Sequence, residues 1–207
     1  MAKKTKIVYT FMMLSSLSFA EFNVGVALET IIDKAIREAP SNFYVGLGIS
    51  TMKLNNTKTN ENLRTISIML QGGYKIYNFL AIEGRYTRNM SKVTYDAGST
   101  NSSNIDDYPT DFTNIAIYLK PSYLYYDFST YALLGYGVTS LTNLPIGDVT
   151  RAEKGFQWGI GLSYEITKNI SFFADYVNCY NSKGFDYRSL DEDITVDTIS
   201  IGINYKF

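Results

Sequence analysis

The chain has 207 residues, a formal net charge of −1 and no histidine. A chain without a surplus of basic residues is not typical of nucleic-acid-binding proteins, and the absence of histidine removes the commonest general base and metal ligand. The single cysteine, Cys179, excludes an internal disulfide. With 18 tyrosines and 12 phenylalanines but only 4 prolines, the composition favours strands joined by polar loops.

Residues 1–20 are typical of an export signal. Lys3, Lys4 and Lys6 make a basic start, a mostly apolar run follows to Leu17, and a small residue, Ala20, ends the segment. The run is too short for a transmembrane helix, which needs roughly 20 apolar residues. We therefore expect residues 1–20 to be a signal peptide that takes no part in the fold.

The next segment, residues 21–40, has a helical period. Its apolar positions are Leu28, Ile31, Ile32, Ala35 and Ile36. Charged residues separate them, and Pro40 follows. This pattern predicts one short amphipathic helix within residues 22–39 that stops at the proline. We expect its role to be structural.

From residue 42 onward the period changes from 3.6 to 2, which indicates strands. In the first of them, Phe43, Val45, Leu47 and Ile49 alternate with small or polar residues. The pattern predicts eight strands, near residues 43–50, 65–76, 80–87, 114–120, 129–140, 156–165, 170–180 and 199–207. Alternation is weakest in the fifth strand, where Leu133 and Leu134 are adjacent.

The connections between these strands are of two kinds. Those after the second, fourth and sixth strands have only a few residues, whereas those after the first, third, fifth and seventh are long and polar. Outer-membrane barrels are organised in this way, with short periplasmic turns and long outer loops. A β-sandwich has no reason to sort its loops so. Residues 41–207 are therefore predicted to form one all-β domain, an eight-stranded antiparallel up-and-down transmembrane β-barrel, preceded by the helix.

The faces of the strands follow from packing. The lumen of an eight-stranded barrel is only just wide enough for side chains, so the rows of glycine and serine suit the inside and the apolar rows face lipid. The inward rows also carry charges of both signs, and we expect these to pair in a lumen charge network rather than to remain free. Its predicted members are Lys75, Glu83, Arg85, Lys120, Glu165, Asp175 and Lys206. A gated ion path through the same residues is the alternative.

Aromatic residues near the strand ends predict a girdle at the membrane interface. Its expected members are Tyr44, Tyr74, Tyr86, Trp158, Tyr164 and Tyr176. The chain ends in alternating apolar and aromatic residues that include Ile203, Tyr205 and Phe207.

On these residues the chain resembles the small outer-membrane β-barrel proteins of the OmpA-like transmembrane, OmpX and opacity-protein type. The resemblance spans nearly the whole of the chain after the predicted signal. It implies residence in the outer membrane of a Gram-negative bacterium. It also implies that Ile203, Tyr205 and Phe207 form the carboxyl-terminal signal that the barrel assembly machinery reads. The OmpA pattern includes a periplasmic peptidoglycan-binding domain, for which this sequence has no counterpart.

Enzymatic activity is not expected. Barrel enzymes of this size use a histidine base, and no nucleophile motif, phosphate-binding loop or cofactor motif is present. Acidic pairs such as Asp106 and Asp107 lie in predicted outer loops, where we expect solvated surface rather than a metal site. The leading hypothesis is an envelope-stabilising or adhesive barrel. Its expected partners are membrane lipid, lipopolysaccharide, the assembly machinery and a surface ligand at the loops. A narrow channel and a carrier of small hydrophobic ligands are the alternatives, and an inward apolar row would favour the carrier.

Overall fold

The structure is a computed structural model that describes residues 42–56, 61–96, 106–108, 111–142, 151–182 and 194–207. The predicted signal peptide and the predicted helix within residues 22–39 lie outside these ranges. Both stay predictions. No helix in the described part of the chain is long and apolar enough to cross a membrane.

The described residues form ten strands. These are β1 (Phe43–Asn56), β2 (Glu61–Tyr77), β3 (Leu80–Asn89), β4 (Val93–Asp96), β5 (Asp106–Tyr108), β6 (Asp111–Tyr125), β7 (Phe128–Thr142), β8 (Arg151–Thr167), β9 (Ile170–Asn181) and β10 (Ile194–Lys206).

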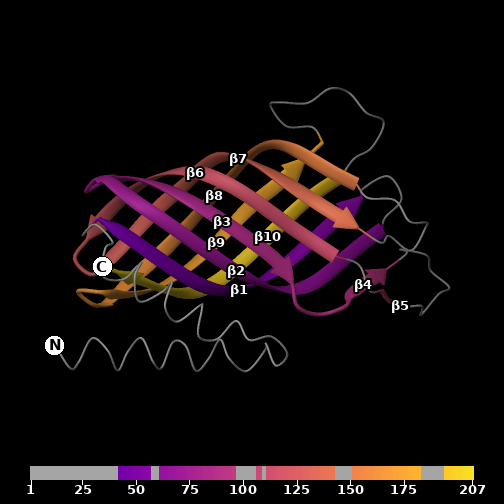
Figure 1. Ribbon diagram of the computed structural model, residues 1–207, viewed down its shortest axis with the longest axis horizontal. Coiled ribbons are helices and arrows are strands. Elements are labelled where there is room, and N and C mark those ends of the chain that lie inside the picture. The colour runs from indigo at the N-terminus through magenta and orange to yellow at the C-terminus, as the bar shows by residue number, and fades with distance from the viewer. Residues whose placement is uncertain (1–41, 57–60, 97–105, 109–110, 143–150, 183–193) are drawn as a thin grey trace, which may run out of the picture. The chain divides into compact units, whose positions relative to one another are not determined.

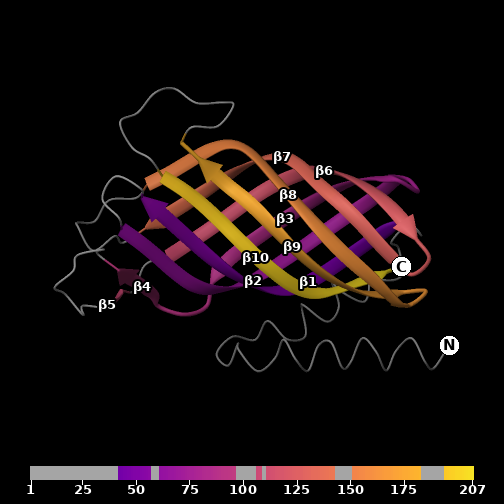
Figure 2. The ribbon, with the colours of Figure 1, turned by 180° about the vertical axis from the view of Figure 1, so that it is seen from behind.

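Eight of the strands close into a barrel. Antiparallel pairing runs in the order β1, β10, β9, β8, β7, β6, β3, β2, and pairing of β1 with β2 completes the ring. The strands run obliquely to the long axis of the barrel (Figures 1 and 2), as closure of a sheet requires. The predicted eight-stranded antiparallel up-and-down barrel is confirmed.

Short turns gather at one end of the barrel, where the carboxyl terminus also lies (Figure 1). Only two residues separate β2 from β3, β6 from β7, and β8 from β9. At the second of these turns Tyr126 has a φ of 53°, a left-handed conformation that a tight hairpin requires. In outer-membrane barrels such turns face the periplasm.

At the other end the strands extend further than the sequence pattern predicts. β1 and β2 remain paired as far as Asn56 and Glu61, so the first connection has four residues, 57–60, instead of the long loop expected. The apolar alternation has faded there, but backbone pairing continues through residues such as Lys53 and Asn55. Hydropathy patterning marks only the part of a strand with an apolar face, so it underestimates strands that continue beyond lipid.

The predicted polar loop after the third strand contains the two short strands β4 and β5. The amides of Met90 and Ser91 both donate to the carbonyl of Ile66, and this shared acceptor interrupts the regular pairing with β2 after the end of β3. β4 then pairs with Asn62–Arg64 of β2, and β5 pairs with β4. β4 therefore continues the line of β3 beyond a kink, and this extension lies at the end opposite the carboxyl terminus (Figure 1).

Apolar rows face outward along the barrel wall. Ile49, Ile117, Ile160 and Ile201 are each about 60% exposed to the surroundings, as a lipid-facing row requires. β7 follows the same rule, because Leu133 is buried inside and Leu134 is exposed outside. The inward rows hold glycine, polar and charged residues over most of the length, and the candidate site lies among them.

Candidate functional site

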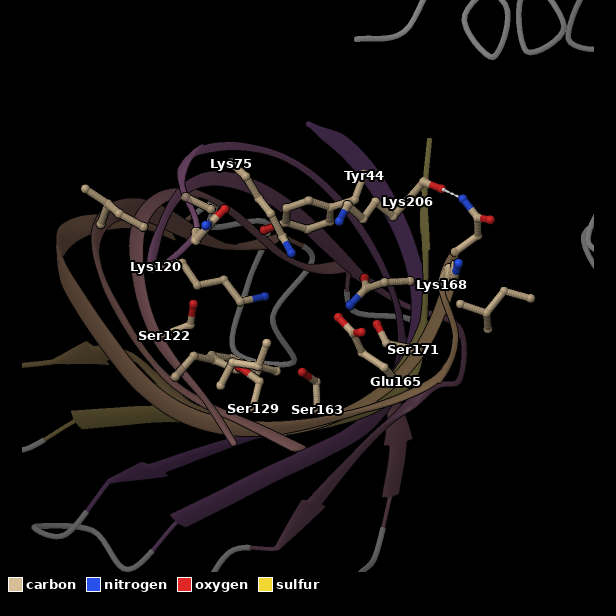
Figure 3. A pocket seen from close by; sticks show the side chains of 18 of the residues that line it. Tyr44, Lys75, Lys120, Ser122, Ser129, Ser163, Glu165, Lys168, Ser171 and Lys206 are labelled. Carbon is tan, nitrogen blue, oxygen red and sulfur yellow. Dashed lines mark hydrogen bonds between the residues drawn. The ribbon is translucent and has the colours of Figure 1, made fainter. Parts of the chain in front are cut away.

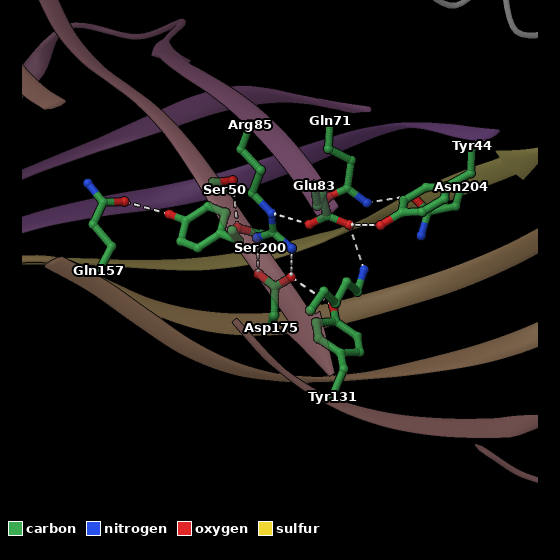
Figure 4. A network of polar contacts seen from close by, with 12 residues as sticks. Tyr44, Ser50, Gln71, Glu83, Arg85, Tyr131, Gln157, Asp175, Ser200 and Asn204 are labelled. Atoms are coloured by element: carbon green, nitrogen blue, oxygen red, sulfur yellow. Dashed lines mark hydrogen bonds and ion pairs between the residues drawn. The ribbon is translucent and has the colours of Figure 1, made fainter. Parts of the chain in front are cut away.

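Four charged side chains from three strands meet inside the barrel (Figure 4). We call them the ionic cluster: Glu83 and Arg85 of β3, Lys120 of β6 and Asp175 of β9. Arg85 Nε lies 2.7 Å from Glu83 Oε1, and its two terminal nitrogens lie 3.1 and 2.7 Å from the oxygens of Asp175. Lys120 Nζ lies 2.7 Å from Glu83 Oε2. Two cations and two anions balance.

Two tyrosines complete this cluster. The hydroxyl of Tyr44 donates to Glu83 Oε2, and that of Tyr131 donates to Asp175 Oδ2 at 2.8 Å. The ammonium of Lys120 also lies 4.1 Å from the ring centre of Tyr131, within cation–π range. Removing charges from water is costly unless each carboxylate and each N–H finds a partner. Here both carboxylates accept several hydrogen bonds, so the cluster meets that condition.

A second, uncharged network lies beside the ionic cluster, and we call it the amide cluster. Gln157 of β8 accepts from the hydroxyl of Tyr118 and donates to Asn114 at 2.8 Å. Thr139 donates to the same oxygen of Asn114 at 2.9 Å. All four side chains are buried. The ring of Tyr118 lies 5.7 Å from the guanidinium carbon of Arg85, which connects the two clusters.

The lumen becomes apolar toward the long-loop end. We call these side chains the apolar plug: Met52, Leu63, Val93, Phe112, Leu141, Cys179, Ile194 and Val196 toward the long-loop end, with Leu133 and Val177 nearer the middle of the wall, opposite Gly159. Met52, Val93, Phe112 and Leu133 have no exposed surface at all. Packing of this kind excludes water. The plug is not apparent from the sequence, because several of its members lie in segments predicted to be polar loops.

The opposite end of the lumen holds a polar cavity of about 100 Å³. Figure 3 shows the side chains of Lys75, Lys120, Lys206 and Glu165 reaching into it from different sides of the wall. Lys168, on the turn after β8, and several serines also line it. The cavity lies among the short turns, and the ionic cluster lies at its inner limit, since Lys120, Tyr44 and Tyr131 belong to both.

The predicted lumen charge network therefore divides into two groups. Glu83, Arg85, Lys120 and Asp175 are joined by ion pairs, whereas Lys75, Glu165 and Lys206 line the cavity and form no ion pair with any described residue. No group of three or more metal-binding side chains is present in the described ranges. The arrangement is suited to closing the lumen.

The prediction for Tyr44 was wrong. This residue was expected in the interfacial girdle, but it points inward, is 5% exposed and donates to Glu83. The reason is its parity, because inward residues of β1 occupy even positions from Tyr44 to Met52. Space for its ring comes from Gly73 on β2, because a side chain at that position would overlap the phenol.

The other predicted girdle residues lie on the outer wall. Tyr74, Tyr86, Trp158 and Tyr164 are exposed, and Tyr176 is half-buried with its hydroxyl 2.6 Å from Asp197. Further exposed aromatics near the short turns were not predicted: Tyr77, Phe79, Tyr123, Tyr125, Tyr126 and Phe128. They lie in turns or at strand ends, outside the alternating segments from which the girdle was predicted.

The carboxyl-terminal residues close the wall. Ile203 and Tyr205 pair with Leu47 and Val45 of β1, and the amide of Phe207 donates to the carbonyl of Phe43 at 3.1 Å. The rings of Phe43 and Phe207 stack with centroids 5.8 Å apart. Recognition of these residues by an assembly machinery stays a prediction.

Solved structures show the same fold. The chain is similar to Neisserial surface protein A (NspA), with 20% identity, a TM-score of 0.54 and coverage of 80% of this chain and 97% of that one. It is also similar to Ail, the attachment invasion locus protein of Yersinia pestis, in complex with the heparin analogue sucrose octasulfate, with 20% identity, a TM-score of 0.51 and the same coverage. At such identities the likeness concerns the fold alone. A search of curated proteins found no match.

The sequence also matches a family model. The model describes the outer membrane protein beta-barrel domain, and the match covers residues 9–207. That span includes every described strand. The expected resemblance to small outer-membrane barrels is thereby confirmed. The chain belongs to the outer membrane protein beta-barrel domain family and is an outer-membrane protein of a Gram-negative bacterium.

Proposed function

We propose that this protein is a non-enzymatic, non-conducting barrel that stabilises the outer membrane and presents its outer edge to surface ligands. The observation that carries the proposal is the filling of the lumen. The ionic cluster and the amide cluster occupy its middle, and the apolar plug extends from the middle to the long-loop end. A continuous water path would have to cross both.

The alternatives need a different lumen. A channel needs the ionic cluster to separate and the apolar plug to admit water, yet Phe112 and Leu133 are completely buried. A carrier of hydrophobic ligands needs an apolar row facing an internal cavity. The long apolar rows face outward instead, and the cavity of about 100 Å³ is lined by lysines and serines.

The absence of catalytic activity is part of the proposal. The sequence has no histidine and a single, buried cysteine. The buried carboxylates Glu83 and Asp175 are saturated by Arg85, Lys120 and two tyrosines, which leaves neither available as a general base.

The outer edge, which is the long-loop end of the barrel, supports a role in recognition. β2 and β8 have 17 residues each, whereas a membrane-spanning strand needs about 9–11, so these strands project beyond the lipid. Ail, which shares the fold, is by name an attachment protein. By this proposal the partners are membrane lipid, lipopolysaccharide, the barrel assembly machinery and a surface ligand.

Single-channel recording tests the closed lumen. The refolded protein is first shown to be a closed barrel by a heat-dependent shift in electrophoretic mobility, because folded outer-membrane barrels resist SDS until heated. It is then inserted into planar bilayers. We expect no discrete conductance steps from folded protein, whereas reproducible steps that disappear with heat-denatured protein would favour the channel.

The outer edge is tested separately. Bacteria that express the protein and isogenic bacteria that lack it are compared for attachment to immobilised heparin, with detergent sensitivity measured in parallel. Loss of attachment alone indicates adhesion, and increased sensitivity alone indicates envelope stabilisation. If attachment and detergent sensitivity are both unchanged, the result contradicts both roles.

A further inference from the structure

The polar cavity at the short-turn end has an unbalanced charge. Glu165 is the one carboxylate among its described lining residues, whereas Lys75, Lys120, Lys168 and Lys206 all line it. Lys120 is neutralised by Glu83 at 2.7 Å. Three ammonium groups therefore share the cavity with a single carboxylate.

The neighbouring ionic cluster cannot supply the missing negative charge. Both oxygens of Glu83 accept hydrogen bonds, one from Arg85 and the other from Lys120 and Tyr44. Asp175 is likewise occupied, since it accepts two bonds from Arg85 and one from Tyr131. The cluster is neutral by itself, and its two carboxylates already have partners within it.

The side chains that hold the surplus converge. Lys75 comes from β2 and Lys206 from β10, and both reach toward the middle of the lumen (Figure 3). Each is partly shielded by the wall. Like charges held together in a partly desolvated space are costly without a counter-ion, so the site favours an anion.

Neutral donors surround the same space. The hydroxyls of Ser122, Ser129, Ser163 and Ser171 belong to four different strand ends around the cavity, and none is used in a hydrogen bond to a described residue. A volume of about 100 Å³ holds several water molecules, so it has room for a small polyatomic anion. Hydroxyl donors spread around an anion suit a ligand with several oxygens better than a spherical halide.

We propose that this cavity is a binding site for a phosphate-type oxyanion that enters from the periplasmic side. Lys75 and Lys206 provide its charge-assisted hydrogen bonds, the serine hydroxyls provide further donors, and Glu165 limits the affinity by repulsion. The ligand is a free phosphate or the phosphate of a small organic ester, since both present the same group. The proposal does not depend on whether the lumen conducts.

Isothermal titration calorimetry of the refolded barrel in an uncharged, phosphate-free detergent tests the site. Inorganic phosphate is expected to bind at one site per barrel. Because each substitution removes a charge-assisted hydrogen bond to the anion, Lys75→Gln and Lys206→Gln should each weaken binding by about tenfold or more. Glu165→Gln should strengthen it by about fivefold, since it removes a like charge. Lys154→Gln, a change on the exposed outer side of β8, is the matched control and should leave the affinity unchanged.

The outcomes separate the site from general charge effects. Glycerol 3-phosphate serves as the organic ester, and tighter binding of one probe than the other identifies the source of the phosphate. Equal binding of chloride at matched ionic strength would overturn the oxyanion assignment. Absence of saturable binding, or equal weakening by the Lys154 control, would overturn the site itself. The heat-dependent mobility shift establishes that each variant is folded before it is titrated.

Discussion

The two ends of the lumen are filled by different chemistry. Toward the short turns the interior is charged, hydrogen-bonded and hollow, whereas toward the long loops apolar side chains pack closely among a few buried threonine and asparagine side chains. A transmembrane barrel separates its lumen from lipid, so an interior apolar cluster here excludes water rather than meeting membrane. One wall therefore encloses two closures of the lumen: the ionic cluster, which we call the electrostatic seal, and the apolar plug, which we call the hydrophobic seal. The two should respond differently to substitution.

The largest effect is expected from breaking the electrostatic seal. Asp175→Ala removes the partner of both terminal nitrogens of Arg85 and of the hydroxyl of Tyr131 in a buried site, so Arg85 keeps only the hydrogen bond from its Nε to Glu83. Loss of one member of a buried ion pair costs about 3–5 kcal/mol of the free energy of unfolding. Urea unfolding in detergent, followed by the fluorescence of Trp158, measures it. A loss below about 1 kcal/mol would show that the cluster contributes little to stability.

The hydrophobic seal is probed by Met52→Ala. Met52 lies in the apolar plug with no exposed surface, so truncation leaves a cavity and should cost about 2–4 kcal/mol. The neighbouring Thr51→Ala, on the exposed face of β1, is the matched control, with an expected change within about 0.5 kcal/mol. Equal effects of the two substitutions would mean that the plug is not packed.

A smaller effect is expected where the wall makes room for the ionic cluster. A methyl group on Gly73 would overlap the ring of Tyr44, which must then shift away from Glu83, so Gly73→Ala should cost about 1–3 kcal/mol. Gly155→Ala is the control, because nothing lies within 4 Å of the added carbon. If thermal or urea unfolding gives the same stability for both, the Tyr44 contact is not restrictive.

The smallest effect is expected for the exposed ion pair between Arg88 and Asp111, whose nitrogen and oxygen lie 3.1 Å apart. Both side chains are about half exposed, so water and salt screen the interaction. Asp111→Ala should change the free energy of unfolding by less than about 1 kcal/mol. A change as large as that of Asp175→Ala would remove the distinction between buried and exposed pairs.

The barrel itself could be predicted because its signals are local. Alternation in segments such as residues 43–50 and 156–165 depends on one strand at a time, and the sorting of connections into short and long needs only chain order. The inward direction of Glu83, Arg85 and Asp175 followed from the same parity.

The partnerships inside the lumen could not be predicted. Arg85 and Asp175 are 90 residues apart, and their meeting depends on how far each strand is staggered around the ring, which no single segment specifies. The apolar plug escaped for a related reason. Phe112 and Leu141 lie near strand ends where alternation is short, so their inward direction emerges only from pairing with neighbours. The prediction for Tyr44 was wrong because aromatic character near a strand end indicates the girdle, whereas the even parity of this residue in β1 decides that it faces inward.

The most direct test of the closed lumen uses the single cysteine, Cys179. Its thiol is buried in the apolar plug, 3.8 Å from the hydroxyl of Thr198. A charged, water-soluble thiol reagent is added to the folded barrel in lipid vesicles and to barrel unfolded in urea, and labelling is followed by mass. We predict labelling of the unfolded chain and protection of the folded one. Rapid labelling of Cys179 in folded barrels that retain the heat-dependent mobility shift would contradict a sealed lumen.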